Sequence, residues 1–221
     1  MLKIRCSSIG KIMTNSRSKT ETLSKTCKTY LQELAVEEMY GKRKEFSSKY
    51  TDKGNQVEDD GIKLCESVLD LGFMYKNEEH FTNDFLTGTP DVNTDIILDV
   101  KSSWDATTFP FFADDIPNKD YFYQLQGYMA LTGKRKSYLC YCLINTPELM
   151  VEDEVRRAHW KENLIDESEE LRNHVEAQHN FDNIPAERRI KTFEVRYDKD
   201  VVKAIYDRVK ECREYYNTLI L

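Results

Sequence analysis

Apolar residues recur at helical spacing in several segments of the chain, each bounded by polar or turn-forming residues. A short helix capped by Ser7 or Ser8 is followed by a polar loop and by a longer helix that stops at Gly41. Further helices are predicted over about residues 51–71, 120–131 and 147–178. A final helix presents Val202, Ile205, Val209, Cys212 and Tyr216 on one face.

Apolar runs and alternating patterns predict strands at residues 73–75, 85–92, 96–102 and 138–144, and a last strand on which Phe193, Val195 and Tyr197 alternate. The polar link 93–95 predicts a hairpin, so the first three strands form a meander. No repeat and no linker-like segment interrupts the chain. We therefore expect one domain over residues 1–221, of the α/β or α+β class, with a central mixed sheet flanked by helices.

Two acidic motifs lie in the predicted hairpin. Thr89-Pro90-Asp91 belongs to its first strand and Asp99-Val100-Lys101 to its second, where residues 99 and 101 share a face. Carboxylates held close together repel unless a hard divalent cation lies between them, and Mg²⁺ favours oxygen ligands. With a lysine that orients a water or helps to deprotonate it, the set suits phosphodiester hydrolysis. An ion pair on an edge strand is the alternative.

Two predicted helices add polar groups to this set. The apolar stripe of the helix at 51–71, extended back by one turn, reaches Glu58, so we expect this carboxylate to point inward. On the helix at 120–131, Tyr121, Gln124 and Tyr128 lie on one face. They suit contacts to phosphate, sugar or a metal-bound water, although tyrosines at the edge of a core would give the same pattern.

These motifs follow an order that resembles the PD-(D/E)xK nuclease superfamily, most closely its phage lambda-exonuclease and YqaJ-type viral recombinase branch. The resemblance covers roughly residues 4–145 and implies the PD-(D/E)xK core fold. The matching segments are Arg5-Cys-Ser-Ser8, Lys53-Gly54-x-x-x-Glu58, Thr-Gly-Thr-Pro-Asp91, Asp99-x-Lys101 and Tyr-x-x-Gln124-x-x-x-Tyr128.

The resemblance also implies a role for each matching position. Asp91 and Asp99 would bind Mg²⁺, or Mn²⁺ in its place, with the Val100 carbonyl and with Glu58, directly or through water. Lys101 would position and activate the water, and Gln124 would hold Lys101 or the scissile strand. The residues implied to bind DNA or its 5′-phosphate are Ser8, Arg5, Thr89, Tyr128 and Lys11.

Charge is distributed unevenly along the 221 residues, which carry 32 Lys and Arg against 39 Asp and Glu, a net charge of −7. Residues 1–30 contain seven basic residues and Glu21 as their one acid. A second basic cluster comprises Lys42, Arg43, Lys44, Lys49 and Lys53. Segregated charge of this kind can form a phosphate-facing surface on an acidic protein, and an ordinary solvated face is the alternative.

The expected activity is that of a Mg²⁺-dependent 5′-to-3′ exonuclease on linear double-stranded DNA in phage-type recombination. A single-strand annealing protein is an expected partner, and a homo-oligomer is expected by analogy. A structure-selective or CRISPR-associated RecB-like nuclease and a non-catalytic DNA-binding module are the alternatives. No iron–sulfur cluster, membrane contact or secretory leader is expected, and six cysteines without a framework spacing indicate the cytoplasm.

Overall fold

The structure, a computed structural model, describes residues 1–43, 47–164 and 166–220. Lys44 of the second basic cluster lies outside these residues. The helices are α1 Ile9–Ile12, α2 Lys25–Tyr40, α3 Lys49–Val68, α4 Lys119–Thr132, α5 Glu148–Lys161, α6 Glu169–His179 and α7 Lys199–Ile220, with 3₁₀ turns η1 Cys6–Ser8 and η2 Ala186–Arg188. The strands are β1 Ile4–Arg5, β2 Phe81–Thr82, β3 Leu86–Gly88, β4 Val92–Asn93, β5 Ile97–Ser102, β6 Lys136–Cys142 and β7 Ile190–Arg196.

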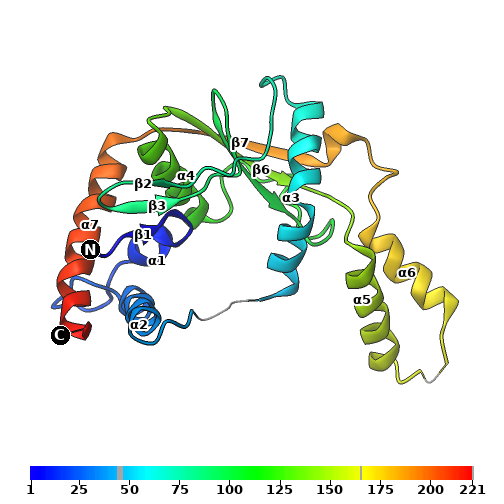
Figure 1. Cartoon of the computed structure of the whole chain (residues 1–221). Coiled ribbons are helices and arrows are strands. Elements are labelled where there is room, and N and C mark those ends of the chain that lie inside the picture. Colours follow the sequence, from blue (N-terminus) through cyan, green and yellow to red (C-terminus); the bar gives the residue numbers. More distant parts are fainter. Residues whose placement is uncertain (44–46, 165, 221) are drawn as a thin grey trace.

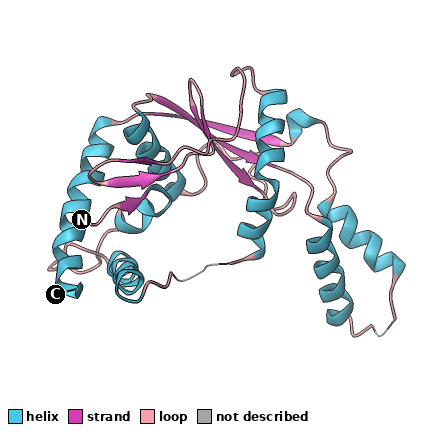
Figure 2. Cartoon of the chain, viewed as in Figure 1, coloured by secondary structure: helices cyan, strands magenta, loops and turns pink. Residues whose placement is uncertain are grey.

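A mixed four-stranded sheet in the order β4-β5-β6-β7 forms the centre of the molecule, and helices lie on both of its faces (Figures 1 and 2). β4 and β5 are antiparallel, as the short polar link between them predicts, and β5 runs parallel to β6. The connection between these parallel strands contains α4, which is the usual crossover for such a pair. The expected fold class, a central mixed sheet flanked by helices, is confirmed.

The predicted meander is wrong, because the segment expected as one strand over 85–92 is divided between two sheets. β3 joins a small sheet in the order β1-β3-β2, whereas β4 joins the central sheet. Between them stands Pro90, which has no backbone N–H to donate to a ladder. Asp91 follows directly, so it lies at the point where the chain passes from one sheet to the other.

Two other predictions of secondary structure are corrected. Residues 73–75 are not a strand, and Phe73 and Tyr75 are largely exposed there. The long helix expected over 147–178 is two helices, α5 and α6, which pair as a hairpin that stands apart from the sheets (Figure 1). The other predicted helices are present, and α2 ends as expected at Gly41, whose φ of 63° is the left-handed conformation that glycine tolerates.

Two hydrophobic clusters cover the two faces of the central sheet. Helix α3 packs on one face through residues such as Val57 and Ile62, which share a cluster with Leu98 and Val100 of β5. Its approach is close at Gly61, where a Cβ atom would lie 2.6 Å from Cγ1 of Val100. The other cluster contains residues of α1, α2, α4 and α7 together with Ile97 of β5.

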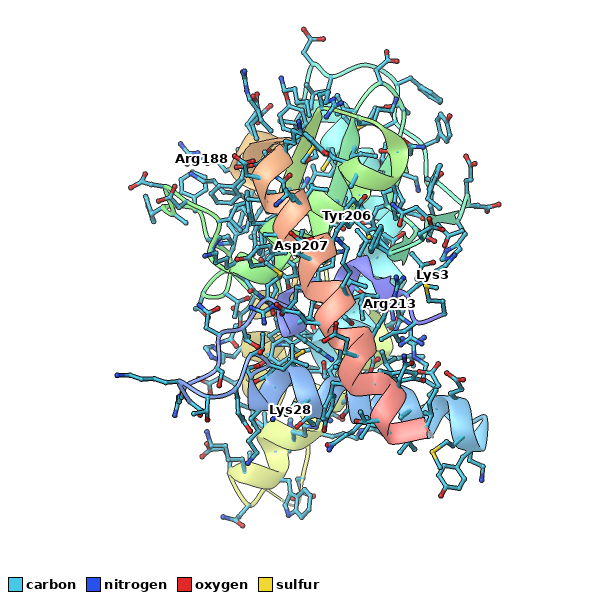
Figure 3. All side chains as sticks on the ribbon, turned by 90° about the vertical axis from the view of Figure 1, so that its left-hand side faces the viewer. Lys3, Lys28, Arg188, Tyr206, Asp207 and Arg213 are labelled. Carbon is cyan, nitrogen blue, oxygen red and sulfur yellow. The ribbon has the colours of Figure 1, made fainter. Side chains whose placement is uncertain are left out.

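Helix α7 runs along the small sheet and fixes the first residues of the chain (Figure 3). The Arg213 guanidinium donates to the Leu2 carbonyl at 3.0 Å, and the Tyr206 ring stacks on Phe85 with centroids 4.4 Å apart. These contacts hold β1 parallel to β3. The sequence does not predict this pair, because β1 has only two residues. None of the described helices has the length and apolar character needed to cross a bilayer.

Candidate active site

The central feature of the site is an ion pair within β5. Asp99 and Lys101 point to the same face as Ile97, toward α4, because side chains alternate along the strand. The Asp99 carboxylate is fully buried, and its Oδ2 lies 2.5 Å from Nζ of Lys101. Burial alone would lower the pKa of Lys101, but the carboxylates of Asp99 and Asp91 outweigh it and raise that pKa above its ordinary value. Lys101 is therefore held as an ammonium.

Asp91 is fastened to the same strand through the backbone. Its Oδ2 accepts a hydrogen bond from the Val100 N–H at 2.7 Å. Burial, and then the negative charge of Asp99, raise the pKa of Asp91 to about 8, although Lys101 and the Val100 N–H oppose the change. The two carboxylates are thus close enough to repel, and Lys101 alone does not fully compensate their charge.

The polar face of α4 closes over this pair. The side-chain amide of Gln124 donates to Asp99 Oδ1 at 3.1 Å and lies 2.9 Å from the Tyr128 hydroxyl oxygen. The Lys101 ammonium lies 5.0 Å from the centre of the Tyr121 ring, a cation–π distance. The helical spacing therefore places all three predicted side chains of α4 at the site, but the contact of Gln124 is with Asp99 and not with Lys101.

Glu58 approaches from α3, which packs on the opposite face of the sheet. Its carboxylate lies 3.1 Å from Nζ of Lys76, which also contacts Asp59 at 3.3 Å. The charge of Glu58 still contributes to the raised pKa of Asp91, so the two carboxylates interact. The described residues contain no group of three or more His, Cys, Asp or Glu side chains arranged around one position. A ligand role for Glu58 remains a prediction.

The donor set fits a hard divalent cation. Asp99 Oδ2 is buried and lies 2.5 Å from the Lys101 ammonium, which is its one close partner in the described residues. Asp91 and Asp99 offer carboxylate oxygens, and the backbone of Val100 lies between them. Oxygen ligands of this kind suit Mg²⁺ or Mn²⁺ rather than a soft metal.

Three of the residues predicted to bind DNA, namely Ser8, Arg5 and Lys11, each have a different environment in the structure. Ser8 is buried in η1. This turn packs closely on α4, since a Cβ atom added at Gly127 of α4 would lie 2.9 Å from Cys6 Sγ of η1. Arg5 is in an ion pair with Glu37 at 2.7 Å, and Lys11 lies 5.0 Å from the centre of the Tyr30 ring. Their DNA-binding roles remain predictions.

Thr89 has a partner that the sequence did not indicate. His80 Nδ1 lies 2.9 Å from Thr89 Oγ1, and His80 Nε2 lies 2.7 Å from Thr87 Oγ1. A Cβ atom added at Gly88 would point toward the Tyr128 ring, at 2.8 Å. Because side chains alternate along an extended chain, the flanking residues 87 and 89 point to the opposite side. The two threonines therefore face away from Tyr128, and no motif in the sequence connected His80 with them.

The second basic cluster is corrected at Lys53. The sequence favours an exposed position for this lysine, on a phosphate-facing surface or on an ordinary solvated face, but it is fully buried and donates to the Ser103 and Trp104 carbonyls just after β5. Its position has a sequence signal, since it precedes the buried residues Val57 and Gly61 by one and two turns of helix. Lys49, in contrast, remains partly exposed and pairs with Glu154 at 3.2 Å.

No family model and no curated protein matches the chain. Among solved structures, a phage-related exonuclease from Haemophilus somnus 129PT is similar over 99% of this chain and 95% of its own, with 32% identity and a TM-score of 0.79. The alkaline exonuclease LHK-Exo of Laribacter hongkongensis shares the fold at 14% identity, with a TM-score of 0.65 over 99% of this chain and 89% of its own. Its complex with dAMP gives the same TM-score of 0.65 and coverage at 16% identity.

The first of these matches extends over nearly the whole of both chains at an identity that indicates common descent. The chain therefore belongs to the phage-related exonuclease family, in the lambda-exonuclease and YqaJ-like branch of the PD-(D/E)xK nucleases.

Proposed function

We propose that this protein is a divalent-metal-dependent exonuclease that hydrolyses linear double-stranded DNA from its 5′ ends in phage-type recombination. Its family is one of exonucleases, which supports nuclease activity on DNA. The observation that carries the proposal is the arrangement on β5, where the buried Asp99, the backbone-anchored Asp91 and the Lys101 ammonium converge. Two carboxylates whose charge one fixed lysine balances only in part suit phosphodiester hydrolysis better than a structural ion pair.

Asp91 and Asp99 would hold Mg²⁺ or Mn²⁺, with the Val100 carbonyl and Glu58 as further ligands. The cation would supply Lewis acidity at a phosphoryl oxygen and a more acidic bound water. Lys101 is fixed as an ammonium by Asp99, so it donates hydrogen bonds that orient a water or a phosphate oxygen. Gln124, held between Asp99 and Tyr128, keeps the carboxylate of Asp99 in one orientation.

Basic residues of the first 30 positions and the exposed part of the second cluster would contact the phosphate backbone. Several of these charges are balanced within the fold, as the pairs Arg5–Glu37 and Lys28–Glu21 illustrate. The net phosphate-facing charge is therefore smaller than the count over residues 1–30 suggests. Binding should weaken as salt increases and should show little sequence preference. An annealing protein as partner and a homo-oligomer belong to the same proposal.

The deciding experiment uses linear duplex DNA labelled at either the 5′ or the 3′ end, incubated with the full chain in Mg²⁺, in Mn²⁺ or in EDTA. We expect mononucleotide release from the 5′ end first, and only when metal is present. Lys101→Met is the catalytic control, and a supercoiled circle is the substrate control. Cleavage that persists in EDTA, or equally in Lys101→Met, would falsify the proposed mechanism.

The same experiment separates the alternative functions. Release of label from the 3′ end first would reverse the proposed polarity. Cutting of the closed circle would identify an endonuclease on the same fold. DNA binding without cleavage under any metal condition would identify a non-catalytic DNA-binding module.

A further inference from the structure

Lys53 is the most unusual buried group among the described residues. It has no exposed surface, although it lies on a helix whose neighbouring lysines, Lys49 and Lys63, reach the solvent. Lysine is almost never fully buried unless its charge is paired. No carboxylate lies within ion-pair distance of its ammonium in the described parts of the chain. Its burial therefore needs an explanation other than a salt bridge.

The partners of Lys53 are backbone carbonyls at the end of β5. Its ammonium donates to the Ser103 carbonyl at 2.8 Å and to the Trp104 carbonyl at 2.9 Å. The rings of Trp104 and Phe181 lie 5.8 and 5.5 Å from the same nitrogen and enclose it. The contact thus fixes two consecutive peptide units at the point where the strand ends.

Residues 103 and 104 lie between β5, which carries Lys101, and the connection to α4, which carries Gln124. Lys101 lies two residues before Ser103 on the same strand, and the Ser103 N–H continues the ladder to the Cys142 carbonyl at 2.9 Å. After Trp104 the chain enters the long connection to α4, which carries Gln124. A shift of the backbone at residues 103 and 104 would therefore change the position of Lys101 and the path that leads to Gln124.

A purely structural role does not require a lysine here. Replacing buried charged groups by apolar side chains of similar size is often neutral or stabilising, because the charge no longer has to be desolvated. A methionine would fill the space between Trp104 and Phe181 but could not hold the two carbonyls. A lysine buried without a carboxylate partner departs from the usual pattern of buried residues, and such departures are expected at functional sites.

We propose that Lys53 is a positioning residue of the nuclease: its ammonium clamps the carbonyls of Ser103 and Trp104 and thereby holds Lys101 in place against Asp99. The inference rests on the proposed function, since it concerns the same active site. Lys53 does not touch the reacting groups itself, and it acts through the backbone of β5.

The clamp also connects the active site to the α5–α6 hairpin. The Trp104 ring lies edge-on to His179 with centroids 5.0 Å apart, and His179 Nδ1 lies 3.0 Å from Thr146 Oγ1. The charge that acts on Lys53 is that of Asp105 after β5, and His179 of α6 in turn interacts with Lys53, Asp105, Lys49 of α3 and Glu154 of α5.

The test compares Lys53→Met with the wild type and with Lys63→Met, a matched lysine of the same helix that is exposed beside Asp60. On linear duplex with Mg²⁺, we expect kcat of Lys53→Met to fall about 100-fold with KM unchanged, since displacement of a catalytic group by about 1 Å costs this much. The thermal midpoint should be equal to or above that of the wild type. Lys63→Met should match the wild type in all three quantities, and Lys53→Arg, which keeps donors for both carbonyls, should recover most of kcat.

A folded Lys53→Met variant with wild-type kcat overturns the proposal, as does Lys53→Arg with the same loss as Lys53→Met. Should Lys53→Met fail to fold, Lys53→Gln decides the question, because its side chain is one atom shorter and its amide cannot reach both carbonyls: a lower kcat at constant KM supports the clamp and an unchanged kcat overturns it. An inactive wild type would refute the proposed function, whereas an active wild type with an equally active Lys53→Met refutes this inference alone.

Discussion

The side-chain amide of Gln124 lies 3.1 Å from Asp99 Oδ1, although 25 residues separate the two in sequence. This hydrogen bond links α4 to the buried carboxylate of β5. It leaves Asp99 Oδ2 to Lys101, because Gln124 occupies the other oxygen. The helix therefore determines which oxygen of Asp99 is available for chemistry.

Gln124→Leu should lower kcat about 10- to 100-fold, since a hydrogen bond to a charged group contributes about 1.5–3 kcal/mol. Gln126→Leu is the matched control: Gln126 lies on the same helix but donates to the Arg196 carbonyl at 2.7 Å, away from the site. We expect Gln126→Leu to lower the thermal midpoint and to keep kcat. Steady-state kinetics together with thermal unfolding of both variants separates the two effects. Equal losses of kcat in the two variants would contradict a specific role of Gln124.

Lys101→Met should reduce the single-turnover cleavage rate by about 10²–10³-fold, in the range seen when one positioned donor is removed from a reacting oxyanion. Binding of duplex DNA should stay within a fewfold of the wild type, because one phosphate contact at most is lost. Fluorescence anisotropy with a labelled duplex in Ca²⁺ measures this binding without cleavage. A variant that cleaves at more than a tenth of the wild-type rate would assign catalysis to other groups.

Asp91→Asn should weaken binding of Mn²⁺ by at least tenfold, measured by isothermal titration calorimetry with the full chain. The reason is that the amide removes one anionic ligand while it preserves size. Asp95→Asn provides the control, because Asp95 is exposed in the turn between β4 and β5. If Asp91→Asn and wild type bind Mn²⁺ equally, Asp91 is not a ligand.

Gly61→Ala should destabilise the protein and lower its activity, because the added Cβ would lie 2.6 Å from Val100 Cγ1 and would push α3 away from β5. Gly54→Ala on the same helix has no atom within 4 Å of the added Cβ. It should instead stabilise the fold by about 0.5–1 kcal/mol through the better helix propensity of alanine. Urea unfolding of both variants measures the difference, and destabilisation by Gly54→Ala would show that another effect dominates on α3.

The stability of the wild type should rise relative to Lys53→Met between about pH 8 and pH 10. Burial lowers the pKa of Lys53 from its ordinary 10.5 to about 8, and Asp105 opposes this shift only in part. In that interval the unfolded chain binds the proton and the native state does not, so raising the pH favours the native state. Below about pH 8 both states are protonated and the difference should be constant. Denaturant unfolding at several pH values tests this, and a difference independent of pH would mean that Lys53 titrates normally.

The acidic core of the site could be predicted from the sequence because its geometry is local. Strand alternation places Asp99 and Lys101 on one face, a short link brings Asp91 beside them, and helical spacing aligns Gln124 with Tyr128. Each of these relations depends on a period of two or of three to four residues.

The remaining features depend on contacts that no period encodes. Residues 85–92 are divided between two sheets because β3 pairs with β1 and β2. These two partner strands are too short to give a pattern in the sequence. The pairing of Glu58 with Lys76 joins α3 to a loop 18 positions later. The burial of Lys53 has a signal in its spacing from Val57, but its charge favours an exposed position, and its partners are the carbonyls of Ser103 and Trp104, about 50 residues later in the sequence.

The anchoring of Asp91 on the Val100 N–H has a consequence for how such enzymes can diverge. Both ends of this contact lie within ten residues of the chain, so the hairpin backbone itself sets Asp91 against Val100, and α4 then orients the Asp99 carboxylate through Gln124. Surface loops, helix faces and interfaces can accumulate substitutions while this small unit keeps its shape. A descendant of this enzyme can therefore change much of its surface, provided that it keeps the hairpin together with the two helices that orient its side chains.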